Sequence, residues 1–106
     1  REGLMGCIEG IIQKKAGQTL VEAGQLPPAA FIVVDGAVEQ RIQGRTMRLY
    51  GADEFIGFRD TLHGISSECE FVIIDKTKLI VFDADRLRQL GLDFPPNVVA
   101  ILERLG

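Results

Sequence analysis

One stretch, residues 55–71 (FIGFRDTLHGISSECEF), holds the residue types best suited to binding a ligand. It is predicted to form a turn, a short helix opened by Gly57, and a loop that leads into a strand. The first amides of a helix lack partners and the helix dipole is positive there, so such an end attracts anions. The chemistry that this stretch suggests is phosphate binding by backbone amides.

The side chains of the stretch do not complete an anion site. Arg59 is its only arginine or lysine, whereas Asp60, Glu68 and Glu70 would repel a phosphate. Arg59 belongs to the first turn of the predicted helix, about 100° from its preceding neighbour, and is expected to face solvent. The residues that we identify as the candidate ligand site are Gly57, Phe58, Arg59, Ser66 and Ser67.

The other chemistry-bearing residues predict neither a metal site nor a catalytic one. His63, the only histidine, is expected to be an exposed loop residue, with a heme or metal ligand as the alternative. Its separation from Cys69 is not typical of metal sites. Cys7 and Cys69 lack CxxC spacing and are interpreted as reduced thiols. Because no GxxxxGKS, GxSxG or HExxH motif occurs, we predict a protein that is not an enzyme.

Length and composition indicate one domain. The chain has 106 residues, 46% of them hydrophobic, and its 12 glycines favour a turn-rich β architecture. A net charge of −3 argues against direct nucleic-acid binding, which needs clustered Lys and Arg. No apolar run is long enough for a membrane span and the start is not a signal peptide, so we expect a cytoplasmic domain. The start at an arginine is consistent with a piece of a longer chain.

Short antiparallel strands are predicted from apolar alternation and turn residues. They cover residues 11–14, 19–22, 30–34, 37–43, 46–50, 70–75 and 78–82, with tight turns at 35–36, 43–44 and 76–77. Residues 1–10 form an N-terminal segment whose helical spacing is weakened by glycines. The fold class is therefore a mainly β, antiparallel β-roll or jelly-roll, similar to a cupin-like barrel, over residues 11–82.

Two helices are predicted over residues 83–106. Asp83 is a good N-cap for a helix over 84–90, which Gly91 is expected to end. A last helix begins near Asn97 and carries an apolar stripe at helical spacing. The stripe, a candidate interface that packs either on its own barrel or on a partner helix, consists of Val98, Ile101, Leu102 and Leu105.

The glycine spacing resembles a known family. The pattern includes Gly17, Leu20, Gly24, residues 31–38 (FIVVDGAV) and residues 50–57 (YGADEFIG). It is similar to the cyclic nucleotide-binding domain of the catabolite activator and Fnr-type regulators, over about residues 11–105. The resemblance implies a cassette that holds a cyclic phosphate by helix amides, a Glu just after the glycine and an Arg near the end of the loop.

The chain departs from that pattern at both charged positions. Phe58 stands where the resemblance implies the Glu, and Ser67 stands where it implies the Arg, or Ser66 or Glu68 in other alignments. Classical cAMP or cGMP binding is therefore not expected, and the ligand, if any, is a cyclic nucleotide or another small anion. Phe58 either plugs the apolar pocket or stacks on a less polar molecule, and Arg59 is a possible substitute cation.

These observations lead to two main functional hypotheses. The first is a regulatory sensor domain of a signalling or transcription-regulator protein, with a small-molecule effector, no resident cofactor and a homodimer contact through the last helix. The alternative is a ligand-free dimerisation or protein-interaction module built on the same helix. A cupin-like enzyme would need a cluster of His and carboxylate ligands, which one histidine does not supply.

Overall fold

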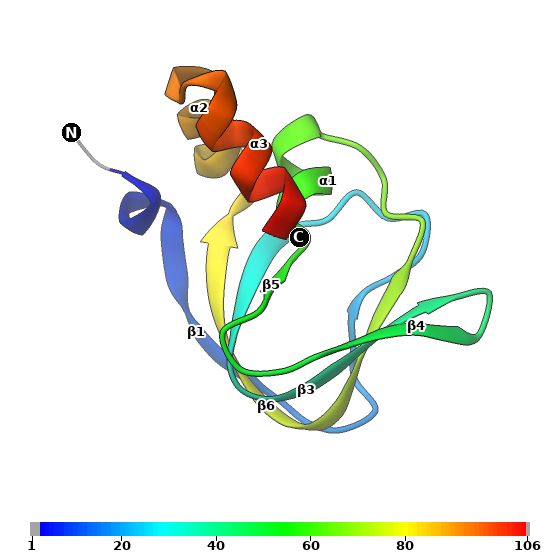
Figure 1. Cartoon of the computed structure of the whole chain (residues 1–106). Coiled ribbons are helices and arrows are strands. Elements are labelled where there is room, and N and C mark those ends of the chain that lie inside the picture. Colours follow the sequence, from blue (N-terminus) through cyan, green and yellow to red (C-terminus); the bar gives the residue numbers. More distant parts are fainter. Residues whose placement is uncertain (1–2, 106) are drawn as a thin grey trace.

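Two long strands dominate the architecture, which we describe from a computed structural model for residues 3–105 (Figure 1). The predictions for residues 1–2 and 106 concern positions outside the described residues. The elements are, in order, η1 (Leu4–Cys7), β1 (Ile8–Lys14), β2 (Thr19–Val21), β3 (Ala29–Ile42), β4 (Arg45–Tyr50), β5 (Phe55–Ile56), α1 (Phe58–His63), β6 (Glu70–Asp83), α2 (Ala84–Asp93) and α3 (Pro96–Leu105).

The described strands form one antiparallel sheet in the order β1-β6-β3-β4, with β2 on β6 and β5 on β3. β3 and β6 pair along almost their whole length, from Ala29 opposite Asp83 to Arg41 opposite Glu70. The sheet rolls up, and the three α-helices gather at one end of the roll (Figure 1). The predicted mainly β fold with a C-terminal helix is thus confirmed.

The turns predicted at residues 35–36 and 76–77 are wrong, because both lie inside continuous strands. At this place the register of β3 and β6 shifts, and the two strands bend together. Gly36 has φ +114°, and a Cβ there would lie 2.3 Å from Thr77 Oγ1 and 2.6 Å from Thr77 Cα. Thr77 is fully buried, and its hydroxyl accepts from the Ala37 amide and donates to the Asp75 carbonyl. The corner therefore needs a glycine on one strand and a hydrogen-bonding threonine on the other.

The buried side chains form two clusters. The first fills the inside of the roll and includes Val33, Val38 and Leu79, which are fully buried. The second lies between the sheet and the helices and includes Phe58 and Leu87. The helices are therefore anchored on the roll by apolar packing at the end where the candidate ligand residues lie.

Several predicted boundaries change. The first strand begins at Ile8 and follows a short 3-10 helix. Asp83 caps α2 as predicted, since its carboxylate accepts from the Arg86 amide at 2.9 Å. Gly91 does not end α2, which continues to Asp93. A Cβ at Gly91 would lie 3.0 Å from the Leu62 side chain, so this glycine permits the close approach of α1 and α2.

We expect Gly36→Ala to destabilise the protein more than Gly44→Ala. Both glycines have positive φ, but a Cβ at Gly44 meets nothing within 4 Å, whereas one at Gly36 meets backbone and side-chain atoms. The shared backbone penalty is about 1 kcal/mol, and the clash at Gly36 adds about 1–3 kcal/mol. Denaturant unfolding of the two variants measures the difference. Equal losses would contradict the corner described here.

Candidate functional site

A cavity of about 480 Å³ lies between the sheet and the segment that follows β5. Its walls come from β3, β4, the start of β6, α1, the loop after α1, and α3. A cavity of this size is in the range that holds small organic ligands. The loop and α1 belong to the stretch 55–71 that the sequence singles out.

The structure divides the candidate ligand residues into two groups. Arg59, Ser66 and Ser67 line the cavity, whereas Gly57 and Phe58 are not part of its lining. Phe58 is fully buried in the second core cluster, with its ring centroid 5.0 Å from that of Phe55 and 5.2 Å from that of Phe82. Its ring therefore packs in the core and does not fill the cavity.

Glycines define both ends of α1. Gly57 is the N-cap with φ +77°, and Gly64 is the C-cap with φ +63°. The Gly64 amide donates to the Thr61 carbonyl at 3.2 Å, and the Ile65 amide donates to the Asp60 carbonyl at 3.0 Å. Left-handed caps of this kind are cheap only for glycine. They limit α1 to six residues and turn the chain from the helix directly into the cavity loop.

Ser67 is a structural residue of the loop. Its hydroxyl donates to the Cys69 carbonyl at 2.7 Å and accepts from the Cys69 amide at 3.1 Å. Its own amide donates to the Gln25 carbonyl, and its carbonyl accepts from the Gly24 amide. The side chain is almost fully buried, so its hydroxyl is already engaged. Ser66 also lines the cavity, and its side chain is exposed.

The sheet supplies a polar wall that the sequence analysis missed. The Arg48 guanidinium lies 4.3 Å from the Tyr50 ring centroid and 2.6 Å from a Glu54 oxygen. The Tyr50 hydroxyl donates to Gln40 Oε1 at 3.4 Å, and Gln40 Nε2 donates to Cys69 Sγ at 3.1 Å. Arg48, Tyr50, Gln40 and Cys69 all line the cavity, while Glu54 holds Arg48 in place. Alternation along β4 is the signal that could have placed Arg48 and Tyr50 on one face.

The opposite face of β4 is apolar and exposed. Met47 and Leu49 alternate with Arg48 along the strand, and their side chains are 58% and 60% exposed. Arg48 and Tyr50 of this strand therefore line the cavity, and its large apolar residues face solvent. This reverses the usual alternation of a half-buried strand.

The charges at the cavity are mixed. Arg48 and Arg59 are the cations in its lining, and Asp60, Glu68 and Glu103 are the carboxylates. Burial raises the pKa of Asp60, while Arg59 lowers it and Glu68 raises it further. These groups come from β4, α1, the loop and α3, so the charges converge from separate parts of the chain.

Groups outside the cavity lining hold the Arg48–Glu54 pair in place. The Gly51 amide, which donates to Glu54 at 2.9 Å, lowers the pKa of Glu54, as does the Arg48 guanidinium. The hydrogen bond with Glu54 raises the pKa of Arg48, and burial raises the pKa of the Tyr50 phenol. Arg48 is thus charged and held in one orientation over the tyrosine ring.

His63 is the last residue of α1 and not a loop residue, which corrects the sequence prediction. Its Nε2 contacts a carboxylate oxygen of Glu103 on α3. Within residues 3–105, no group of three His, Cys, Asp or Glu side chains is arranged to hold a metal ion. Cys69 is a free thiol, and Cys7 is buried in the second core cluster.

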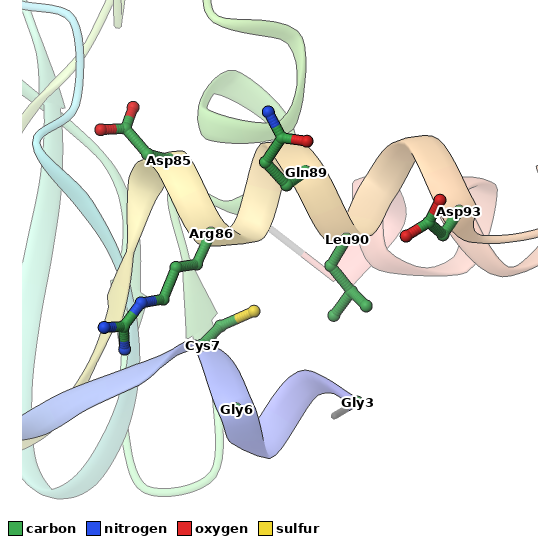
Figure 2. Close-up of a pocket in the computed structure, with 8 residues that line it drawn as sticks. All are labelled: Gly3, Gly6, Cys7, Asp85, Arg86, Gln89, Leu90 and Asp93. Carbon is green, nitrogen blue, oxygen red and sulfur yellow. The ribbon is translucent and has the colours of Figure 1, made fainter. Parts of the chain in front are cut away.

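A second cavity, of about 330 Å³, lies between η1 and α2. Figure 2 shows Cys7 and Leu90 pointing into it from opposite sides, with Gly3 and Gly6 along one wall. None of the candidate ligand residues belongs to this cavity. The cavity beside α1 is therefore the one that contains residues of the candidate ligand site.

Residues 11–93 match the sequence profile of the cyclic nucleotide-binding domain. The chain belongs to this family. The matched segment includes the rolled sheet from the fourth residue of β1 onward, α1 and α2. No curated protein matches the sequence. None of the helices within residues 3–105 is both long and apolar enough to cross a membrane.

Solved structures with this fold include PKAR CBD2 with bound Sp-2Cl-cAMPS, with a TM-score of 0.78 and 13% identity over 95% of this chain and 68% of that chain. The C-linker/CNBHD of zELK channels, crystallized in the presence of cAMP, has a TM-score of 0.77 and 17% identity over 95% and 52%. The Thermus thermophilus catabolite activator protein has a TM-score of 0.72 and 21% identity over 95% and 51%. The chain thus spans about half the length of the last two. At these identities the likeness shows a common fold.

We expect Glu54→Gln to reduce the loss of stability that the protein suffers in acid. The folded-state pKa of Glu54 is lowered, so its stabilising contribution is present above its unfolded pKa and disappears as pH falls through the folded value. Solvent screening makes the effect modest, because the side chain is 37% exposed. Unfolding curves between pH 6 and pH 3 measure it, with the exposed Glu9→Gln as the control. Parallel acid profiles for wild type and Glu54→Gln would contradict this assignment.

Proposed function

We propose that this chain is a regulatory sensor domain that binds a small molecule in the cavity between α1 and the sheet. The observation that carries the proposal is the cavity itself, about 480 Å³ in volume and lined by elements of the sheet, the cassette and the C-terminal helix. A ligand there would touch elements that are far apart in the sequence. Such a site can bias the position of one element against another, which is the basis of regulation by a ligand.

The ligand that best fits the lining is a small organic anion. Arg48 and Arg59 offer guanidinium groups, which bind carboxylates and phosphates through paired hydrogen bonds. Arg48 is already oriented by Tyr50 and Glu54. In this proposal Arg48 and Arg59 take the anion-binding role of the Arg that the family resemblance implies. Recognition of cAMP or cGMP by the usual contacts is therefore not part of the proposal.

The wider setting of the domain is also proposed. A domain of this kind works as a binding module, not as an enzyme, within a cytoplasmic signalling or transcription-regulator protein. The net charge of −3 supports a domain that does not itself grip nucleic acid. The free Cys69 thiol fits a reducing compartment.

Thermal unfolding with millimolar small anions tests the site directly. We expect no shift with cAMP or cGMP, and a shift on the order of 10 °C for a ligand at a hundred times its dissociation constant. Cyclic dinucleotides, nucleoside monophosphates and aromatic carboxylates are the probes. For a ligand found in this way, Arg48→Ala or Arg59→Ala is expected to weaken binding about tenfold or more, since each removes a charged hydrogen bond.

Arg45→Ala is the matched control, because Arg45 is an exposed arginine of the same strand outside the cavity lining. It is expected to leave ligand binding unchanged. Micromolar binding of cAMP or cGMP, or ligand binding that is indifferent to both Arg48 and Arg59, would overturn the proposed site. Binding that weakens equally in all three variants would indicate a general charge effect instead.

A ligand-free dimerisation module is the second candidate, and α3 is the observation that favours it. Leu102 is buried, but Ile101 and Leu105 are 48% and 42% exposed. Val98 at the start of the stripe is half-buried. The stripe therefore packs on its own chain with one part and leaves another part open for a second copy.

If α3 mediates dimerisation, Ile101→Asp is expected to convert a dimer into a monomer without unfolding it, because this side chain is exposed. Leu102→Ala is the contrasting variant, and it is expected to cost about 2–4 kcal/mol of stability instead. Sedimentation velocity over a range of concentrations distinguishes the two effects. A wild-type chain that stays monomeric at high concentration would remove this candidate.

A further inference from the structure

α3 is attached to the rest of the chain mainly at α1. One buried apolar residue, Leu102, anchors the helix. The polar attachment is the contact between Glu103 and His63, which lies at the C-terminal end of α1. An attachment with so little buried surface contributes little free energy, so a single polar contact is a large part of it.

Glu103 has a second position in the structure. Besides contacting His63, it lines the cavity whose other walls include Arg59 and Asp60 of α1. The side chain that ties α3 to α1 is therefore also part of the cavity wall. A change in how α3 docks changes the cavity at the same time.

We propose that His63 makes the docking of α3 on α1 sensitive to pH. With His63 protonated, the contact with Glu103 is an ion pair; with His63 neutral, it is an ordinary hydrogen bond. Imidazole groups ordinarily change charge between pH 5 and 8, and glutamates are ionised above about pH 4.3. Docking is thus strongest in mildly acidic solution and weakens as the pH rises, which loosens one wall of the cavity.

The charges around the pair favour this direction. On α1, Asp60 feels the charges of Arg59 and His63, and the loop residue Glu68 acts on the same carboxylate. The carboxylates of Asp60, Glu68 and Glu103 all line the cavity. A neutral His63 therefore removes a cation from a cavity whose lining holds Glu103 and two other carboxylates.

The arginines of the neighbouring helices do not replace the imidazolium. Arg88 of α2 donates to the Thr61 carbonyl at 3.4 Å and pairs with Asp85 at 2.6 Å. Arg104 of α3 is exposed. Within residues 3–105, His63 is the residue whose side chain contacts the Glu103 carboxylate. The proposal goes beyond the proposed function, because it needs no bound ligand.

A double-mutant cycle of His63→Gln and Glu103→Gln at pH 6 and pH 8 tests the proposal. At pH 6 the two residues are expected to be coupled by about two- to fivefold in the folding equilibrium constant, the range of partly exposed ion pairs. At pH 8 the coupling is expected to be clearly smaller, because only the hydrogen bond remains. Both residues are partly exposed, so neither substitution is expected to prevent folding.

Amide hydrogen exchange of α3 gives a second, local measurement on the unmodified chain. After correction for intrinsic rates, the protection of residues 101–104 is expected to fall by a similar factor between pH 6 and pH 8. The fall is expected to disappear in His63→Gln and Glu103→Gln and to persist in Arg104→Gln, which removes a charge from the same helix. Equal coupling at both pH values, or α3 protection that does not depend on pH in the wild type, would overturn the proposal.

Discussion

The approach of Gly36 to Thr77 is the constraint on which the rest of the structure depends. The two longest strands, β3 and β6, must bend at the same place for the sheet to roll up. The absence of a Cβ on one strand and the buried hydroxyl on the other make that bend possible. On one side of the corner the strands carry the helices, and on the other they carry the polar wall with Gln40. The position of the cavity and the position of the helices therefore both depend on this one bend in the backbone.

Features that depend on nearby residues could be predicted from the sequence. The Asp83 cap, the turn at residues 43–44 and the short helix after Gly57 each follow from local chemistry, and the structure has all three. The Gly36 corner could not be predicted in the same way. A glycine after an aspartate also suits a hairpin, and only the partner strand with Thr77 decides between the two.

The cavity lining also divides into residues that are neighbours in the sequence and residues that only the fold brings together. Arg59, Ser66 and Ser67 belong to one continuous segment, so the sequence could indicate them. Arg48, Tyr50 and Gln40 come from two other strands and act through contacts among themselves and with Cys69 and Glu54. Their grouping follows from strand register, which a single sequence specifies weakly. Glu103 joins the cavity only because α3 folds back onto α1.

The burial of Phe58 also limits which side chains position 58 can accept. Where the family resemblance implies an acidic side chain, this chain has a ring packed between Phe55 and Phe82. A carboxylate at that place would now be enclosed by apolar neighbours and would cost several kcal/mol. An acidic residue at position 58 would thus require the aromatic cluster to be repacked. The aromatic packing of this core therefore decides which side chain position 58 can hold, and with it what a ligand could meet there.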